Sequence, residues 1–453
     1  MLDEFSVRKE KLARLIEVGV NPYPAETERT ASCGEAASQF DAWSAEAREI
    51  TLAGRLMTVR AHGALAFADL TDDTGKLQIL LREDALDEKT FRTFCDLIDP
   101  GDFVQATGTL FVTKRGEKTL LVSSWTLLCK TLRPLPEKWH GLQDVEQRFR
   151  KRYLDLLMST DVRDRMIARS KIVTAIRSFM DAQNFIEVET PTLQPVYGGG
   201  FARPFITHHN ALEADFYLRI SDEMYLKRLI VGGLERVYEI TKVFRNEGVD
   251  HDHNPEFTMF EAQAAYHDYR WGMDIFEGIF EHAATAAFGT TEIVHEDATI
   301  SVQRPWARYR LIDSVRELGG LDATMWTSLE QAKTELSARL SAKKRGELER
   351  MHSLGECLAF AFEELVEEKL IQPTIIYDYP IEVSPLAKKS SDPRYVERFE
   401  AFALGMEIGN NYSELNDPLD LERRFIEEKK KEAAGFDEAP SARTAGRGSP
   451  PSY

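Results

Sequence analysis

A charged segment over residues 236–257, RVYEITKVFRNEGVDHDHNPEF, has the pattern of a β-hairpin that holds a nucleotide. Glu239, Arg245, Glu247 and Glu256 place opposite charges at close spacing on its two strands, and a polar tip begins at Gly248. An arginine can clamp a phosphate through two parallel hydrogen bonds, and the tip can cover a bound base. The segment therefore predicts a nucleotide clamp. The alternative is an exposed hairpin with incidental ion pairs.

Two carboxylates nearer the C-terminal end, Glu407 and Glu414, are candidate magnesium ligands. Hard oxygen donors suit a cation that bridges phosphates. Their odd spacing would place them on opposite faces of a regular strand, so we expect a bulge at residues 409–411 to restore a common face. Two surface acids near a turn are the alternative.

Short alternating strands fill residues 49–131, separated by Asp-Thr-Gly, Pro-Gly-Asp and Arg-Gly-Glu turns. Five such strands favour a small barrel of the oligonucleotide-binding type, with an ordinary β-barrel interaction module as the alternative. Phe67 beside Arg60 and Gln78 suits a face on which unpaired bases stack.

Helical patterns surround this barrel. Residues 4–18 form a charged amphipathic pattern, and Ser159 or Thr160 begins a long helix with a broad apolar stripe. A proline-bounded connector, 133–139, precedes that helix. We expect residues 328–370, which are rich in Glu and Lys, to be a mainly helical, solvated insertion.

Composition limits the class of protein. The 453 residues suffice for two or three domains, and a formal net charge of −18 argues against indiscriminate coating of nucleic acid. Four cysteines without CxxC spacing predict reduced thiols in the cytoplasm. No segment has the apolar length of a signal peptide core or of a membrane span, which predicts a soluble protein.

Several motifs together resemble the class II aminoacyl-tRNA synthetases, and the lysyl-tRNA synthetases in particular. FRNEG followed by HNPEFTM resembles motif 2, and residues 160–191 resemble motif 1. Similar matches are LRPLPEKWHGLQDVEQRFRKRYLDL, YLRISDEMYLKRLIVGG, YPIEVSPLAKK and EIGNNYSELNDP. The resemblance implies an α+β fold: an N-terminal five-stranded OB-fold barrel, then a class II catalytic domain with an antiparallel sheet flanked by helices.

The same resemblance implies the division of the chain. It places a helical extension at 1–48, the anticodon-binding barrel at 49–132, a linker at 133–158, an incomplete catalytic domain at 159–432 and a disordered tail at 433–453. It also implies a homodimer built through motif 1, with no membrane partner.

The resemblance implies ATP-dependent ligation of L-lysine to tRNA(Lys) through a lysyl-adenylate, with Mg2+ as cofactor. Neither step needs a protein nucleophile, because the substrate carboxylate attacks the α-phosphate. Arg245 is the expected catalytic clamp on that phosphate. The implied ATP-binding residues are Arg245, Glu247, His253, Asn254 and Phe257; the lysine-binding residues are Gly199, Glu223, Glu261, Gln263, Asn410, Tyr412 and Glu414; the metal ligands are Glu407 and Glu414; and the anticodon-binding residues are Arg60, Phe67 and Gln78.

The chain departs from the family pattern at three places. Gln263 stands where a tyrosine is usual, Asn411 replaces a small residue and is expected to crowd the site, and nothing after Glu432 resembles motif 3. The last departure predicts low activity. Two alternatives to a lysine ligase stay open at this point: an inactive tRNA-binding or regulatory protein, and a ligase for aspartate or asparagine, which Glu223 and Glu261 disfavour by repulsion.

Overall fold

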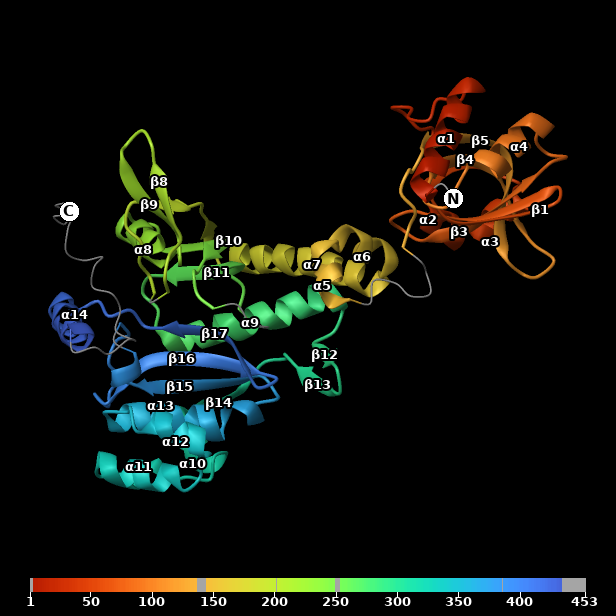
Figure 1. Cartoon of the computed structure of the whole chain (residues 1–453). Coiled ribbons are helices and arrows are strands. Elements are labelled where there is room, and N and C mark those ends of the chain that lie inside the picture. Colours follow the sequence, from red (N-terminus) through yellow and green to blue (C-terminus); the bar gives the residue numbers. More distant parts are fainter. Residues whose placement is uncertain (1–2, 137–143, 201, 249–252, 385, 434–453) are drawn as a thin grey trace. The chain divides into compact units, whose positions relative to one another are not determined.

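The structure is a computed structural model that describes residues 3–136, 144–200, 202–248, 253–384 and 386–433, with backbone alone for 427–433 (Figure 1). It divides into two compact units, Met1–Val162 and Arg163–Tyr453. Parts of three predictions lie outside the described residues: 137–143 of the linker, 249–252 of the hairpin tip and 434–453 of the tail.

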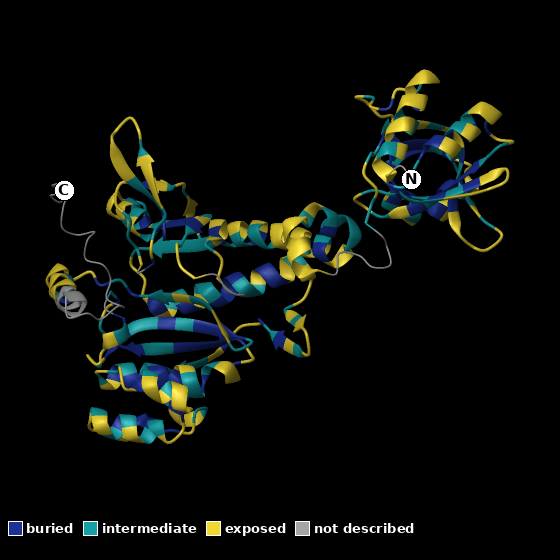
Figure 2. Ribbon diagram, viewed as in Figure 1, coloured by how far each residue is buried: buried dark blue, intermediate teal, exposed yellow. Residues whose placement is uncertain are grey.

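The first unit is built around a closed barrel of five strands in the order β1-β2-β3-β5-β4. Side chains alternate between its interior and its outer surface, because successive residues of a strand point to opposite faces. Figure 2 shows the buried interior in dark blue. The predicted five-stranded barrel is confirmed. Its strands are β1 (Glu49–His62), β2 (Leu65–Thr71), β3 (Lys76–Arg82), β4 (Phe103–Val112) and β5 (Lys118–Cys129).

Short helices complete this unit. Asp87 caps α4 by accepting a hydrogen bond from the Thr90 amide at 2.9 Å, and Phe91 and Phe94 of α4 join the barrel core. Buried Lys130 binds Asp99 at 2.6 Å and Asp102 at 2.7 Å. The helices are α1 (Glu4–Glu17), α2 (Cys33–Ser38), α3 (Phe40–Ala45), α4 (Glu88–Leu97), α5 (Val145–Arg150) and α6 (Arg152–Met158).

The second unit contains a four-stranded sheet in the order β14-β15-β16-β17, covered on both faces by helices (Figure 1). Ile375 and Ile376 of β15 point to opposite faces and belong to two separate cores. Helix α9 packs on one face, and α10 and α13 pack on the other. The elements are α9 (Tyr269–Phe288), β14 (Ala307–Arg310), α10 (Leu311–Glu317), α13 (Leu354–Leu365), β15 (Thr374–Pro380), β16 (Tyr395–Ala403) and β17 (Met406–Tyr412).

Residues 328–370 are helical as expected, but the expectation of a solvated insertion is wrong. Cys357, Leu358, Phe360 and Phe362 of α13 are buried in the core against the sheet. The many Glu and Lys residues lie on the outer faces of these helices. Because they dominate the composition, the apolar positions on the inner face were not recognised in the sequence. The shorter elements here are η1 (Ala323–Met325), α11 (Leu329–Ser337), α12 (Ala342–Leu348), η2 (Glu367–Lys369) and η3 (Ile381–Val383).

A hairpin of β10 (Arg236–Phe244) and β11 (Glu256–Ala264) forms the second sheet, with β6 (Ile186–Glu187) at its edge. Helix α8 (Glu223–Val231) packs on both hairpin strands. The predicted hairpin is confirmed by nine antiparallel residue pairs. The other elements are α7 (Thr160–Ala182), β7 (Leu193–Gln194), β8 (Ile206–His209), β9 (Ala214–Leu218), β12 (Glu292–His295), β13 (Ala298–Ser301) and α14 (Pro418–Ala433).

Candidate active site

Arg245, the residue expected to clamp phosphate, lies where the hairpin strands separate. The Arg245 amide donates to the Pro255 carbonyl at 2.9 Å, and its Nε donates to the Ile220 carbonyl at 3.4 Å. Its guanidinium lies 5.3 Å from the centre of the Phe257 ring. This contact holds the arginine over an aromatic face. The two residues expected to clamp phosphate and stack on the base are thus neighbours.

The other expected ATP ligands lie on the two sides of the hairpin tip. Glu247, His253 and Asn254 are all exposed. Residues 249–252, which were expected to cover the base, lie outside the described residues. The structure therefore brings Arg245 and Phe257 together and leaves the other three accessible to solvent.

An acid cluster joins α8 to the end of β17. Tyr412 Oη donates to Glu223 Oε1 at 2.7 Å. The ammonium of Lys227 lies 2.5 Å from Glu223 Oε1 and 2.9 Å from Glu414 Oε2. Burial lowers the pKa of Lys227, but the two carboxylates outweigh that effect and raise it above its ordinary value. The site thus contains a bound alkylammonium group that belongs to the protein.

The third expected acid, Glu261, is held by neutral donors. It accepts bonds from Ser221 Oγ at 2.9 and 3.0 Å and from the Asp222 amide at 3.0 Å. Asp222 itself is fully buried, and neither of its carboxyl oxygens has a hydrogen-bond partner among the described residues. Burial and the adjacent Glu261 carboxylate raise the pKa of Asp222 to about 9. We therefore treat Asp222 as neutral.

Gly199 packs against the turn that begins α8. Its φ is +86°, and a Cβ there would lie 2.9 Å from Ser221 Oγ and 3.1 Å from Glu223 Cβ. Gln263 hydrogen-bonds Glu414 and so reaches the acid cluster. Both residues therefore belong to the expected lysine site by position.

Asn410 and Tyr412 share one face of β17, whereas Asn411 lies on the other. Asn411 Oδ1 is only 2.5 Å from the place that a Cβ on Gly272 of α9 would take. The expectation that Asn411 crowds the site is therefore wrong, because this side chain packs against α9. Asn410 itself is exposed.

The two expected metal ligands lie in different surroundings. Glu407 borders a cavity of about 320 Å³ with Arg398 and Glu400, and burial followed by the Glu400 charge raises the pKa of Glu407 to about 7. Glu414 lies beyond the end of β17 and is paired with Lys227. The predicted bulge exists, but it falls at residue 408 and not at 409–411. No group of three or more metal-binding side chains occurs among the described residues.

The three expected anticodon-binding residues lie on the outer surface of the barrel. Arg60 of β1 is directly opposite Phe67 of β2. Gln78 of β3 is opposite Asp69 and accepts a bond from Thr119 Oγ1 at 3.0 Å. Arg60, Phe67 and Gln78 thus lie on three adjacent strands, β1, β2 and β3.

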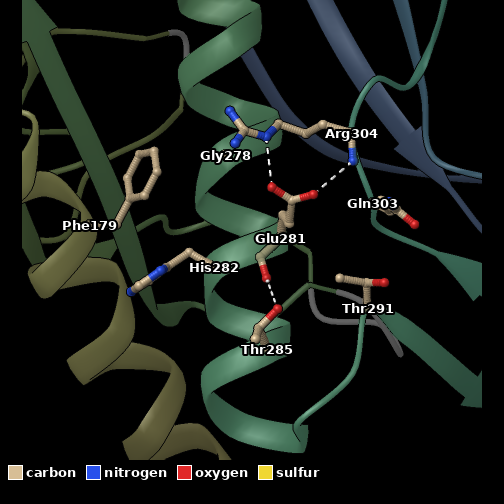
Figure 3. Close-up of a pocket in the computed structure, with 8 residues that line it drawn as sticks. All are labelled: Phe179, Gly278, Glu281, His282, Thr285, Thr291, Gln303 and Arg304. Carbon is tan, nitrogen blue, oxygen red and sulfur yellow. Dashed lines mark hydrogen bonds and ion pairs between the residues drawn. The ribbon is translucent and has the colours of Figure 1, made fainter.

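A larger cavity, of about 400 Å³, lies away from this chemistry, between α7 and α9 (Figure 3). Phe179 and His282 line one side, and Glu281 receives bonds from the amide and Nε of Arg304. None of the expected site residues lines it. The candidate active site therefore lies at the acid cluster and the hairpin, and not at this cavity between α7 and α9.

Sequence reasoning missed three residues around the acid cluster. Lys227 follows Glu223 by four residues on a helix, a spacing that predicts their pairing but not the contact with Glu414. Asp222 carries no local signal of its burial. Arg219 holds strand β10 of the hairpin, because its Nη1 binds Glu239 at 2.8 Å and its Nε donates to the Lys242 carbonyl.

The sequence matches known families over both units. Residues 144–450 match the tRNA synthetases class II (D, K and N), and residues 50–128 match the OB-fold nucleic acid binding domain. The lysine–tRNA ligase of Moorella thermoacetica is 47% identical over 439 residues, which cover 96% of this chain and 88% of that protein. The chain belongs to the class II lysine–tRNA ligases.

Other members of this lysine–tRNA ligase family show similar agreement. The lysine–tRNA ligase of Thermoanaerobacter sp. is 45% identical over 96% of this chain and 86% of its own length, and that of Clostridium tetani is 46% identical over 95% and 86%. The family uses ATP. All four cysteines are free thiols, and no helix within the described residues has the length and apolarity to cross a membrane.

Proposed function

We propose that this chain joins L-lysine to tRNA(Lys) through a lysyl-adenylate. The observation that carries the proposal is the acid cluster, in which Glu223 and Glu414 hold a lysine ammonium of the protein itself. A site that binds the Lys227 side chain in this way has the negative charge and the hydrogen-bond acceptors to bind the same group on a free amino acid. An acidic substrate would be repelled there.

One group of residues binds lysine, and a second group binds ATP. Glu223, Glu261 and Glu414 bind the two ammonium groups of lysine, with Gly199, Gln263, Asn410 and Tyr412 around them. Arg245 binds the α-phosphate of ATP, and Glu247, His253 and Asn254 bind the rest of the nucleotide. Phe257 stacks on adenine once Arg245 turns toward the phosphate.

The first step forms a bond between a lysine carboxylate oxygen and the α-phosphorus, and pyrophosphate leaves with the electrons of the broken bond. Arg245 neutralises the charge that builds on the phosphate oxygens. In the second step a terminal ribose hydroxyl of tRNA attacks the acyl carbon and displaces AMP. Neither step uses a protein nucleophile.

Magnesium would be held by Glu407 and Glu414 and would supply charge neutralisation across the phosphates. Glu407 and Glu400, which line the same cavity, supply two carboxylates for such a cation, and burial, followed by the Glu400 charge, raises the pKa of Glu407. Glu414 is shared with Lys227, so it becomes a ligand only when that ion pair opens.

Three further features belong to the proposal. The outer barrel face with Arg60, Phe67 and Gln78 would read the tRNA anticodon. Exposed Met166 and Ile167 on α7 supply apolar surface for a homodimer. The free thiols agree with a cytoplasmic location.

Lysine-dependent exchange of pyrophosphate into ATP, followed by aminoacylation of tRNA(Lys), tests the function. We expect exchange with L-lysine and none with L-aspartate or L-asparagine. Binding of tRNA without exchange would favour the alternative of a regulatory tRNA-binding protein. The expectation of low activity rests on residues 433–453 and stays a prediction, since 434–453 lie outside the described part of the chain.

A further inference from the structure

The ammonium of Lys227 occupies a site formed by residues from two segments that are distant in the sequence. Its ammonium lies between Glu223, one helical turn earlier on α8, and Glu414, which follows β17. The ring of Tyr412 is 5.9 Å away, and the Tyr412 hydroxyl donates to the same Glu223 oxygen. An arrangement of two carboxylates and an aromatic ring around one nitrogen is suited to binding an alkylammonium ion.

A second ammonium cannot share this position without cost. Glu223 Oε1 already accepts bonds from Lys227 and from Tyr412, and Glu414 Oε2 accepts from Lys227. Like charges brought within a few ångströms of each other in a partly buried site repel strongly. The ammonium of a bound lysine and that of Lys227 therefore compete for Glu223 and Glu414.

Lys227 can also leave. Its side chain keeps 29% of its surface exposed, so a path to solvent is open. Four side-chain bonds rotate, and an ammonium returned to water keeps its hydration. Glu261, by contrast, is fixed by Ser221 and the Asp222 amide and stays available when Lys227 moves.

We propose that Lys227 is an internal occupant of the amino-acid site, which the ammonium of free lysine must displace. The inference rests on the proposed function and adds a residue that sets affinity and selectivity. When only a fraction of the sites is open, the apparent dissociation constant rises by the inverse of that fraction. A ligand without a cation finds Glu223 and Glu414 already paired with Lys227 and cannot replace it.

Calorimetric binding of L-lysine to the full chain tests this inference without requiring catalysis. Lys227→Met keeps an unbranched side chain that is shorter by one atom, and it removes the charge. We expect it to tighten L-lysine binding on the order of tenfold. The matched control is Lys344→Met, because the Lys344 ammonium also bridges two carboxylates, Glu347 at 3.2 Å and Glu364 at 2.6 Å, on helices far along the chain. Its lysine affinity should equal that of the unaltered protein.

The outcomes are distinguishable. Equal or weaker lysine binding by a folded Lys227→Met variant, with lysine bound normally by the unaltered protein, overturns the inference and leaves the proposed function standing. No lysine binding by any of the three proteins overturns both.

Chemical reactivity supplies a readout that a purely structural role would not change. In the unaltered protein, acetylation of Lys227 relative to Lys344, measured by peptide mapping, should rise severalfold when L-lysine is added. The ratio cancels reagent consumed by free lysine. An unchanged or lower ratio would show that Lys227 stays in place and would refute displacement.

Discussion

The hydroxyl of Tyr412 donates to Glu223 across 2.7 Å, and this bond ties β17 to the first turn of α8. Burial and the nearby carboxylates raise the pKa of Tyr412 far above its ordinary value, so the hydroxyl remains a donor at all working pH values. Glu223 is thereby held by a neutral donor on one side and by Lys227 on the other. The relationship joins two segments of the lysine site that lie almost two hundred residues apart in the sequence.

Tyr412→Phe should weaken L-lysine binding by roughly 10- to 100-fold, because a hydrogen bond to a charged group contributes about 1.5–3 kcal/mol and Glu223 loses its orientation without it. Calorimetry with L-lysine measures the effect. Tyr266→Phe is the control, since Tyr266 is 88% exposed. An unchanged affinity in Tyr412→Phe would show that the hydroxyl does not position Glu223 for the substrate.

Arg245→Ala should lower lysine-dependent pyrophosphate exchange by roughly 10² to 10³ in rate, because it removes a donor that acts on charge built up at the α-phosphate. ATP affinity should fall and lysine affinity should change little. Lys242→Ala serves as the control, because Lys242 lies three residues earlier on β10 and pairs at the surface with Glu256. Exchange within threefold of the unaltered protein would exclude Arg245 from this role.

Phe67→Ala should weaken tRNA(Lys) binding by about 1–3 kcal/mol, the range for loss of one stacked base, and leave L-lysine binding intact. Filter binding and calorimetry measure the two affinities. Val112→Ala, an exposed position elsewhere on the barrel, should change neither. A melting curve of the barrel separates loss of stacking from unfolding, and tRNA affinity that survives in folded Phe67→Ala contradicts the stacking role.

Asp222→Asn should stabilise the second unit, and the gain should increase with pH. In the folded protein the carboxyl keeps its proton up to a pKa of about 9, whereas the unfolded chain releases it near pH 4. Between these values the unfolded state binds fewer protons, so the free energy of unfolding falls as pH rises, by at most about 1.4 kcal/mol per pH unit. Asparagine does not titrate, so Asp222→Asn removes this fall in the free energy of unfolding.

Urea denaturation at pH 5, 6.5 and 8, followed through hydrogen exchange of α8 and β11, measures the difference. Asp164→Asn is the control, because Asp164 is exposed on α7. A gap between Asp222→Asn and the unaltered protein that is constant or shrinks with pH would mean that Asp222 is ionised in the folded state.

Local sequence patterns were enough to predict the barrel strands and the hairpin. Alternation with a period of two marked the five barrel strands and the hairpin of β10 and β11, and the structure has both. The same periodicity placed Phe67 and Arg60 on one outer face. These features depend on residues two to four positions apart, so the printed order of side chains already specifies them.

Contacts between distant segments could not be predicted in this way, because they depend on how the elements pack. Composition suggested a solvated insertion at 328–370, yet α13 supplies core residues, because a few apolar positions on one helical face outweigh a polar average. The bulge lies at residue 408 and Asn411 turns toward α9. Lys227 pairs with Glu223 by helical spacing, but its contact with Glu414 exists only because β17 and α8 pack together. Such contacts follow from how whole elements pack, and no neighbouring residue encodes them.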